Sequence, residues 1–241
     1  MKKAITKGSL HEIIRLHRDG VDINGLFNFK GNRYAPLSYA CYRGDFDMVK
    51  YLIDFGANVN GPQICDHSYI SLCHIPIFVA LHNNDNEMMI CMLVHGADLN
   101  IPIPIIVGEH ILFRAISMQR ESILETLLQF GANLNTINSR GQSPLTLAVD
   151  LNYVEVTKIL ILYGSNIDFQ NFNGMTALGI ANSNTDITML LLLEGANVNI
   201  KGYCEEDRNE HPLVIRCRYA VPLLYNGMHR DMVDLFLKFI I

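Results

Sequence analysis

Apolar residues recur along the chain at helical spacing, in short blocks divided by glycine. In the stretch 35–60, an apolar segment begins at Pro36, which suits the first turn of a helix because its missing N–H would have no partner there. Gly44 then interrupts the pattern, and Gly56 stands where a left-handed residue would end a second helix. Four residues between these glycines form one apolar stripe at helical spacing: Met48, Val49, Leu52 and Ile53. The stretch therefore predicts two helices joined by a tight turn.

The same block returns along the chain. Its final glycine recurs with spacings of 36, 40, 35, 33 and 31 residues, at Gly20, Gly56, Gly96, Gly131, Gly164 and Gly195. A small residue stands sixteen positions before the first five of these glycines and fourteen before the last: Ala4, Ala40, Ala80, Ala115, Ala148 and Ala181. Ser143 and Thr176 are placed to cap the first helix of their repeats. One helix pair cannot bury its apolar stripe alone, so we expect the pairs to stack.

The repeats divide the chain into about seven segments, of which the first and the last are incomplete. We expect one domain over residues 1–241, with repeats at about 1–24, 25–60, 61–100, 101–135, 136–168, 169–199 and 200–241. The last predicted helix ends on Phe239, Ile240 and Ile241 without a polar cap. Because the end of a stacked array needs such a cap, we expect either that the natural chain continues or that this end packs on another surface.

The stretch SPLTLAVDLNYVEVTKILILYGSNID, at 143–168, resembles the ankyrin repeat, whose core reads T-P-L-H-x-A, a Gly turn and V-x-x-L-L-x-x-G-A-x-x-N. The resemblance recurs in register over nearly the whole chain. It implies an all-α solenoid of stacked helix-turn-helix repeats with β-hairpin fingers. The family histidine is replaced throughout, by Ser38, Phe78, Phe113, Thr146, Gly179 and Leu224. This departure puts in question the hydrogen bonds that the Thr and His of the motif supply between repeats.

The fingers differ in length. Asn135 and Pro144 are nine positions apart, as in a plain repeat, whereas the fingers that end at Pro36, Pro76, Ile111 and Pro222 are longer by three, seven, two and fourteen residues. Insertions in repeat proteins tend to lie on one face, often the binding face. Specificity is therefore expected in the long fingers at 61–74 and 200–220.

The stretch CDHSYISLCH, at 65–74, raises the question of a metal site. Cys65, His67, Cys73 and His74 offer the nitrogen and sulfur ligands of tetrahedral zinc, but two of them are adjacent and the spacing matches no standard zinc pattern. The second long finger holds Cys204, His211 and Cys217, about four repeats away, so the two fingers cannot share one ion. A Cys204–Cys217 disulfide would need an oxidising compartment. We favour ordinary loops and predict neither metal nor cofactor.

Composition narrows the function. The 241 residues are 49% hydrophobic and 18% charged, with net charge −5, which is typical of a packed protein and gives no basic cluster for nucleic acid. No signal peptide and no apolar run of membrane-spanning length occur, and the six cysteines are irregularly spaced, so an intracellular protein, in the cytoplasm or nucleus, is expected.

No motif for catalysis is found. Gly-rich phosphate loops, G-x-S-x-G, H-E-x-x-H and C-x-x-C are missing from the sequence. His82 and His110 suit surface or packing positions better than catalysis, and Glu205, Glu206 and Asp207 suit either a solvated loop or a contact for a basic partner. We predict a non-enzymatic protein with no small-molecule substrate.

The family resemblance implies contacts with a partner protein at the finger tips and at the exposed end of each first helix. Arg33, Tyr34, Tyr42 and Arg43 are the expected anchor, because Tyr and Arg dominate binding hot spots, although Tyr42 could instead cover a neighbouring helix. Phe172 stands on a turn with little to pack on. The full predicted set is Asn32, Arg33, Tyr34, Tyr42, Arg43, His74, His82, Asn83, Glu109, Ser117, Met118, Ser139, Arg140, Gln142, Asp150, Leu151, Phe172, Asn173 and Met175.

These observations favour a scaffold or adaptor that binds a partner protein through its concave face and fingers. One alternative is an inhibitor that masks a signalling or transcription-factor partner. The abundance of Ile and Asn is typical of AT-rich genomes, which also suits a viral or bacterial effector directed at its host. A ubiquitin-ligase subunit that recruits substrates would require a further module after residue 241.

Overall fold

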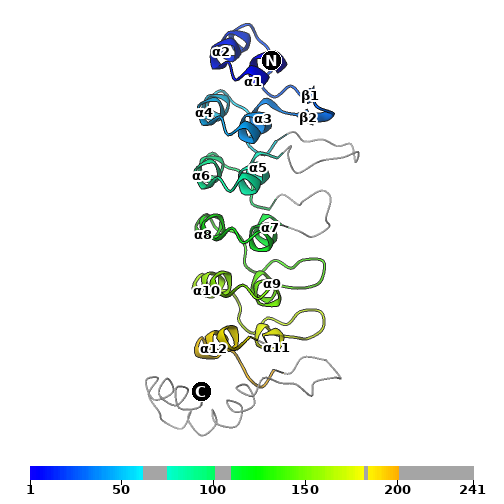
Figure 1. The fold of residues 1–241 in the computed structure, drawn as a ribbon, viewed down its shortest axis with the longest axis vertical. Helices are drawn as coiled ribbons and strands as arrows, with labels where there is room; N and C mark the ends of the chain where they lie inside the picture. The colour runs from blue at the N-terminus through cyan, green and yellow to red at the C-terminus, as the bar shows by residue number, and fades with distance from the viewer. Residues whose placement is uncertain (62–74, 101–109, 182–183, 201–241) are drawn as a thin grey trace. The chain divides into compact units, whose positions relative to one another are not determined.

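The structure is a computed structural model that describes residues 1–61, 75–100, 110–181 and 184–200. The chain divides into two compact units, Met1–Ala132 and Asn133–Ile241, and each is described by itself. In both, the predicted helix pairs that fall within the described residues are observed (Figure 1), whereas the repeat predicted at 200–241 lies outside them. We call the leading helix of each pair the first helix and the other the second helix.

The N-terminal unit, Met1–Ala132, contains four described helix pairs and one hairpin (Figure 1). Its first helices lie on the side from which the connecting loops project, and they are α1 (Lys2–Lys7), α3 (Pro36–Arg43), α5 (Pro76–Asn83) and α7 (Ile111–Ser117). The second helices are α2 (Leu10–Arg18), α4 (Phe46–Asp54), α6 (Asn86–Val94) and α8 (Glu121–Gln129). Strands β1 (Phe27–Phe29) and β2 (Asn32–Tyr34) form the antiparallel hairpin of the first finger.

The C-terminal unit, Asn133–Ile241, repeats the same construction in its described part. Its first helices are α9 (Pro144–Asp150) and α11 (Ala177–Ile180), and its second helices are α10 (Val154–Leu162) and α12 (Thr185–Leu193). Helix α9 packs against both α10 and α11. The predicted caps are observed, because Ser143 and Thr176 accept hydrogen bonds from the backbone N–H groups of Thr146 and Gly179.

The turn inside each of the first five helix pairs contains a left-handed residue. Gly8 and Gly44 supply it in the first two repeats, with φ of 70° and 65°. At the same place in the next three repeats stand Asn84, Gln119 and Asn152, with φ of 56°, 52° and 62°. A side chain in this conformation is strained by roughly 1–2 kcal/mol, and asparagine bears it better than glutamine. The turn is therefore retained even where its preferred residue is missing.

The core follows the repeat. The residue four positions before each glycine of the 56–195 series has no exposed surface: Leu52, Met92, Leu127, Leu160 and Leu191. The six repeated alanines, which permit close approach of the first helices, are at most 3% exposed. The apolar stripe of the second helices and the small residue of the first helices, both predicted from the sequence, thus pack together in one layer.

Polar side chains that follow the second helices join successive repeats. The Asn24 amide donates to the Gly56 carbonyl at 3.2 Å, and its oxygen accepts from the Asn58 N–H at 2.8 Å. Asn60 accepts from the Asp98 N–H, and in the C-terminal unit Asp168 accepts from the Asn197 N–H, both at 2.8 Å. These bonds tie repeats together without the family histidine.

The fingers take two forms in the described part of the chain. Only the first finger forms strands, whereas the fingers at 136–143 and 169–176 are turns, closed by hydrogen bonds from Asn138 N to Gln142 O and from Asn171 N to Met175 O at 3.0 Å each. The long fingers predicted at 61–74 and 200–220 lie outside the described residues. Of the fingers that the structure describes, therefore, one alone is a strand hairpin as predicted.

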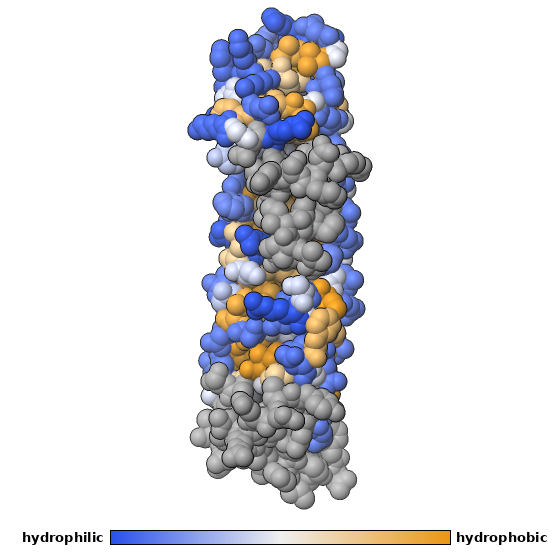
Figure 2. All heavy atoms as spheres, turned by 90° about the vertical axis from the view of Figure 1, so that its right-hand side faces the viewer, coloured by the Kyte–Doolittle hydropathy of each residue, from blue (hydrophilic) through white to orange (hydrophobic). Residues whose placement is uncertain are grey.

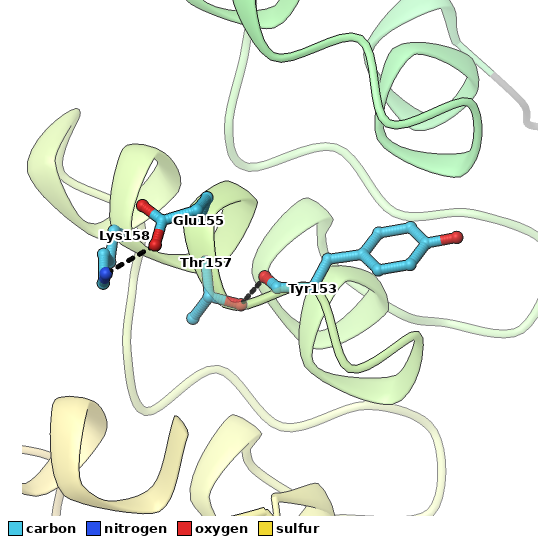
Figure 3. Close-up of polar contacts among 4 residues, drawn as sticks. All are labelled: Tyr153, Glu155, Thr157 and Lys158. Atoms are coloured by element: carbon cyan, nitrogen blue, oxygen red, sulfur yellow. Dashed lines mark hydrogen bonds and ion pairs between the residues drawn. The ribbon is translucent and has the colours of Figure 1, made fainter. Parts of the chain in front are cut away.

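Helix α10 carries both buried and exposed polar side chains, and the two kinds have different partners (Figure 3). The buried Thr157 hydroxyl donates at 2.8 Å to the carbonyl of Tyr153, the residue just before α10, so this hydroxyl is not left unpaired. Glu155 and Lys158 form an exposed ion pair at 2.7 Å, and the Tyr153 ring points away from it. Such a pair contributes at most about 1 kcal/mol. The outer face of α10 is an ordinary solvated surface.

Candidate functional site

The first finger carries a cluster of aromatic rings. Phe27 and Phe29 lie on one face of β1, and Phe27 is paired across the hairpin with Tyr34. The rings of Phe27, Phe29 and Tyr34 all meet the Tyr39 ring of α3, with centroids 5.5, 5.1 and 5.4 Å apart. Tyr34 and Tyr39 are buried, whereas Phe27 and Phe29 are half-buried. Edge-on packing of this kind stabilises the finger against α3.

Tyr42 extends the cluster to solvent. Its ring lies 6.1 Å from that of Tyr34 and 6.2 Å from that of Tyr39, and 53% of the residue is exposed. Tyr42 therefore fits both predictions made for it. One side of its ring packs on the cluster, and the other side remains open to a partner.

Two cations flank these rings. Lys30 Nζ lies 5.6 Å from the centre of the Phe29 ring, within the range of a cation–π contact. Lys30 and Gly31 form the hairpin turn with φ of 48° and 83°, the sign that a two-residue type I′ turn requires. On α3, Arg43 Nη1 donates to the Thr6 carbonyl at 3.2 Å, which holds the guanidinium against the end of α1.

Arg33 lies apart from the rest of the predicted anchor. It is paired with Asn28 across the hairpin, so it faces away from the side that carries Phe27, Phe29 and Tyr34. The structure thus brings together Tyr34, Tyr42 and the neighbouring Arg43, and places the exposed Arg33 on the opposite face of the finger. For Asn32 the structure gives its backbone pairing with Phe29.

The ends of α5 and α7 continue the line of first helices. The Asn83 amide donates to the Cys41 carbonyl at 3.3 Å, so this predicted contact residue also joins two repeats, and His82 beside it is exposed. The exposed Ser117 hydroxyl donates to the Phe113 carbonyl at 2.9 Å, and Met118 is half-buried. The predicted contacts at His74 and Glu109 lie outside the described residues.

In the C-terminal unit, Gln142 has an internal role that the sequence did not reveal. It is only 7% exposed, and its amide oxygen accepts from Asn138 Nδ2 while its Nε2 donates to Asp150, both at 3.0 Å. Gln142 therefore links the finger to the end of α9. Because its polar atoms are occupied, it positions the exposed Asp150 instead of facing solvent, contrary to the expectation of an open contact.

Phe172 has a packing partner after all. Its ring lies directly against Gly141 of the preceding finger, where a Cβ atom would overlap it, although 72% of the residue is exposed. Gly141 also has φ of 70°, which favours glycine. The other predicted contacts of this unit are the exposed Ser139, Arg140, Asn173 and Leu151 and the half-buried Met175.

The described residues hold no group of three or more His, Cys, Asp or Glu side chains that could bind a metal ion. Burial raises the pKa of the Cys41 thiol above its ordinary range, and the nearby Cys91 and Asp85 raise it further. Burial also raises the pKa of Cys91. Both thiols stay protonated at neutral pH, so neither is a ready nucleophile. The residues Cys65, His67, Cys73 and His74, and those of the 200–220 finger, are outside this description.

Comparison with known proteins agrees with the helix-pair geometry. A family model described as ankyrin repeats (3 copies) matches residues 1–103, 77–171 and 112–202. The chain belongs to the ankyrin repeat family. Ankyrin repeats are protein–protein interaction modules and typically not enzymes, and their predominantly helical fold is the one observed here.

Relatives of this ankyrin chain include viral and animal proteins. It is 30% identical over 158 residues to the ankyrin repeat protein FPV014 of Fowlpox virus (strain NVSL), covering 64% of this chain and 33% of that protein. It is 25% identical over 198 residues to the B-cell lymphoma 3 protein homolog of Mus musculus (80% and 42%). It is 30% identical over 121 residues to the ankyrin repeat and SOCS box protein 11 of Mus musculus (49% and 36%). The chain spans a third to a half of the length of the first relatives it matches.

The ankyrin helices are short. Of the helices that the structure describes, none has the length and apolar character needed to cross a membrane.

Proposed function

We propose that this ankyrin chain is a non-enzymatic scaffold or adaptor that binds a partner protein through its fingers and the exposed ends of its first helices. The observation that carries the proposal is the exposed Tyr42, whose ring extends a packed aromatic cluster into solvent beside Arg43. A rigid aromatic ring loses little conformational entropy on binding, and Tyr and Arg dominate hot spots.

The proposed contact surface in the N-terminal unit comprises Tyr42, Arg43, His82 and Asn83, with Arg33 as a separate contact on the opposite face of the finger. In the C-terminal unit it comprises Ser139, Arg140, Asp150, Leu151, Phe172, Asn173 and Met175. Tyr34 and Gln142 support this surface from below, because both are buried. Contacts at Asn32, His74, Ser117, Met118 and Glu109, and in the fingers at 61–74 and 200–220, remain part of the proposal.

A second candidate is an inhibitor that masks a signalling or transcription-factor partner. It is supported by the similarity to the nuclear factor NF-kappa-B p105 subunit of Gallus gallus, 26% identical over 79% of this chain. The similarity to a SOCS box protein supports instead a substrate-recruiting role within a longer protein, and the viral relatives support an effector directed at a host. An intracellular location is proposed for all of these, and the free thiols of Cys41 and Cys91 support it.

The test is an affinity capture from cell lysate with mass spectrometry, using wild type and the double variant Tyr42→Ala/Arg43→Glu. Circular dichroism and thermal unfolding first establish that the variant is folded. The proposal predicts a protein that wild type retains and the folded variant loses. Equal recovery by both would contradict the assignment to Tyr42 and Arg43. Adding the captured protein's other ligands then separates a scaffold, which tolerates them, from a masking inhibitor, which competes with them.

A further inference from the structure

Charged residues are unevenly distributed between the two helix layers of the N-terminal unit. The finger and first helices, at residues 2–7, 25–43, 75–83 and 110–117, contain seven Lys or Arg residues and not one Asp or Glu. The four second helices contain six carboxylates and only three Lys or Arg residues: Glu12, Asp47, Asp54, Glu87, Glu121 and Glu125, with Arg15, Arg18 and Lys50. Asp66 and Glu109, in the loops between, lie outside the described residues. The described part of the finger and first-helix layer in this unit is therefore cationic within a chain of net charge −5.

The cations are distributed along neighbouring first-helix ends. Lys7 and Arg43 occupy the last turns of α1 and α3, and His82 lies in the last turn of α5. The Arg43–Thr6 hydrogen bond joins the first two of these ends, and the Asn83–Cys41 hydrogen bond joins the second to the third. The hydrogen bond found for Arg43 uses one of its five donors, which leaves the guanidinium able to bind a carboxylate.

The carboxylates in the turns nearest to these cations already accept hydrogen bonds at helix starts. Asp45 and Asp85 follow α3 and α5, and each caps the next helix by accepting the N–H of Met48 or Met88, at 3.2 and 2.9 Å. These bonds hold one carboxylate oxygen of each residue at the start of the next helix, while Asp45 Oδ2 lies next to Gly8 at the end of α1.

The cations border an apolar centre. Lys30 stands over Phe29, and Phe29 contacts Tyr39, which contacts the exposed Tyr42 beside Arg43. In the view onto the fingers, apolar and strongly hydrophilic residues lie side by side near the N-terminal end (Figure 2). We call Lys7, Lys30, Tyr42, Arg43 and the half-buried Phe29 the finger-edge surface.

From this arrangement we propose that the finger-edge surface binds an acidic segment of a partner protein, with an aromatic or aliphatic side chain of that segment seated against Tyr42 and Phe29. Arg43 and Lys30 pair with carboxylates on either side of that apolar anchor. The inference rests on the proposed function and specifies the chemistry of the partner. Its basis is charge complementarity, which steers association and rejects basic competitors.

An acidic protein segment fits this surface better than a nucleic acid does. Nucleic-acid binding relies on neutralising several phosphates, and the net charge of −5 on the whole chain repels an extended polyanion. The cations here are few and surround aromatic rings, which suits a short segment with one apolar anchor.

The test starts from a display library of random peptides selected against the full chain. Enriched peptides are synthesised with a fluorescent label, and their binding is measured by anisotropy at low and high salt. The measurement is repeated with Lys30→Glu and Arg43→Glu. Lys50→Glu is the matched control, because Lys50 is an exposed cation of the same unit on the second helix α4. Lys158→Glu, at an exposed position on the second helix α10 of the C-terminal unit, is a second control.

The proposal predicts enrichment of Asp and Glu around an aromatic or aliphatic residue, and affinity that falls with salt. It predicts a loss of about tenfold for Lys30→Glu and for Arg43→Glu, with little change for either control. Selected peptides without acidic enrichment, or equal losses in the controls, would overturn this inference and leave the proposed function intact. No selected peptide, together with no captured protein, would overturn both. Tighter binding to a labelled random RNA oligonucleotide than to any peptide would also overturn it.

Discussion

The corresponding surfaces of the two units differ although their helix pairs are built alike. In the N-terminal unit, the finger and first helices carry seven cations and no carboxylate in their described residues. In the C-terminal unit, the same layer, at 136–150 and 169–181, carries one of each, Arg140 and Asp150. There, polar groups bind one another, as in the Asn138–Gln142–Asp150 series and the side-chain hydrogen bond between Asn184 and Asn152. The repeat sets the scaffold, and the residues outside its pattern set what the scaffold can bind.

The fingers of the two units also differ in what they can present to a partner. The three extra residues of the first finger allow a strand hairpin with an aromatic face, whereas the described fingers of the C-terminal unit are short turns rich in asparagine. A hairpin presents alternate residues on opposite faces and so places cations and rings independently. A turn held by its own asparagine side chains presents fewer side chains to a partner.

The largest expected effect tests what the two units share. Leu127→Ala and Leu160→Ala each remove a fully buried side chain at the same repeat position and should lower the free energy of unfolding by about 2–5 kcal/mol. Leu162→Ala is the matched control, because Leu162 lies on α10 but is 81% exposed, and it should change stability by no more than about 0.5 kcal/mol. Urea unfolding followed by circular dichroism measures all three. A control loss equal to that of Leu160→Ala would refute the assignment of the core.

The next effect separates the two kinds of finger. Gly141→Ala adds a Cβ both at positive φ and against the Phe172 ring, so it should lower stability by roughly 2–3 kcal/mol. Gly31→Ala in the first finger has the same backbone problem but open space around the Cβ, and should cost about 1 kcal/mol.

The double variant Gly141→Ala/Phe172→Ala isolates the contribution of the ring. In thermal unfolding, this double variant should recover most of the stability that Gly141→Ala loses beyond the loss in Gly31→Ala. If Gly141→Ala and Gly31→Ala cost the same, the Cβ added at Gly141 meets no steric conflict with the Phe172 ring.

A smaller effect tests the bonds between repeats, which are present in both units. Asp168→Ala and Asn60→Ala each remove the acceptor of a backbone N–H from the next repeat and should each cost about 1 kcal/mol. Asp168→Asn keeps an oxygen at that place and should retain most of the stability. Hydrogen exchange at the Asn197 and Asp98 amides reports the loss directly, and unchanged exchange in the alanine variants would argue against the bonds.

The smallest expected effect on stability tests the surface that distinguishes the N-terminal unit. Lys30 holds a left-handed conformation that asparagine adopts more readily, so Lys30→Asn should raise stability by about 0.5–1 kcal/mol. The same change removes a cation from the finger-edge surface and should weaken binding of the selected acidic peptides. Lys50→Asn, on a second helix, should affect neither property appreciably. A Lys30→Asn protein that is more stable and binds equally well would show that the strain at Lys30 is unrelated to recognition.

The regular part of the fold could be predicted from the sequence because the same residue pattern recurs in each repeat. Glycine, alanine and the apolar stripe recur in register, and Pro36, Ser143 and Gly44 act as their local chemistry predicts. The turn at Gln119 is predictable only from the alignment of repeats, since glutamine by itself does not favour positive φ.

The candidate site was less predictable because it depends on register and on side-chain pairing. Arg33 and Tyr34 are adjacent in sequence, but the Lys30–Gly31 turn fixes a register that places them on opposite faces. Gln142 occupies a finger position usually open to solvent, and its burial follows from three hydrogen bonds with two residues, Asn138 and Asp150, that no local pattern specifies. Phe172 finds Gly141 only once two successive fingers are stacked.

The most direct test of the account is hydrogen–deuterium exchange of the full chain with and without a selected acidic peptide at saturation. The account predicts slower exchange in β1, β2 and the last turn of α3, with exchange in the fingers at 136–143 and 169–176 unchanged. Slower exchange confined to those two C-terminal fingers, with 27–43 unaffected, would contradict the claim that the cationic, aromatic surface of the N-terminal unit is the recognition surface.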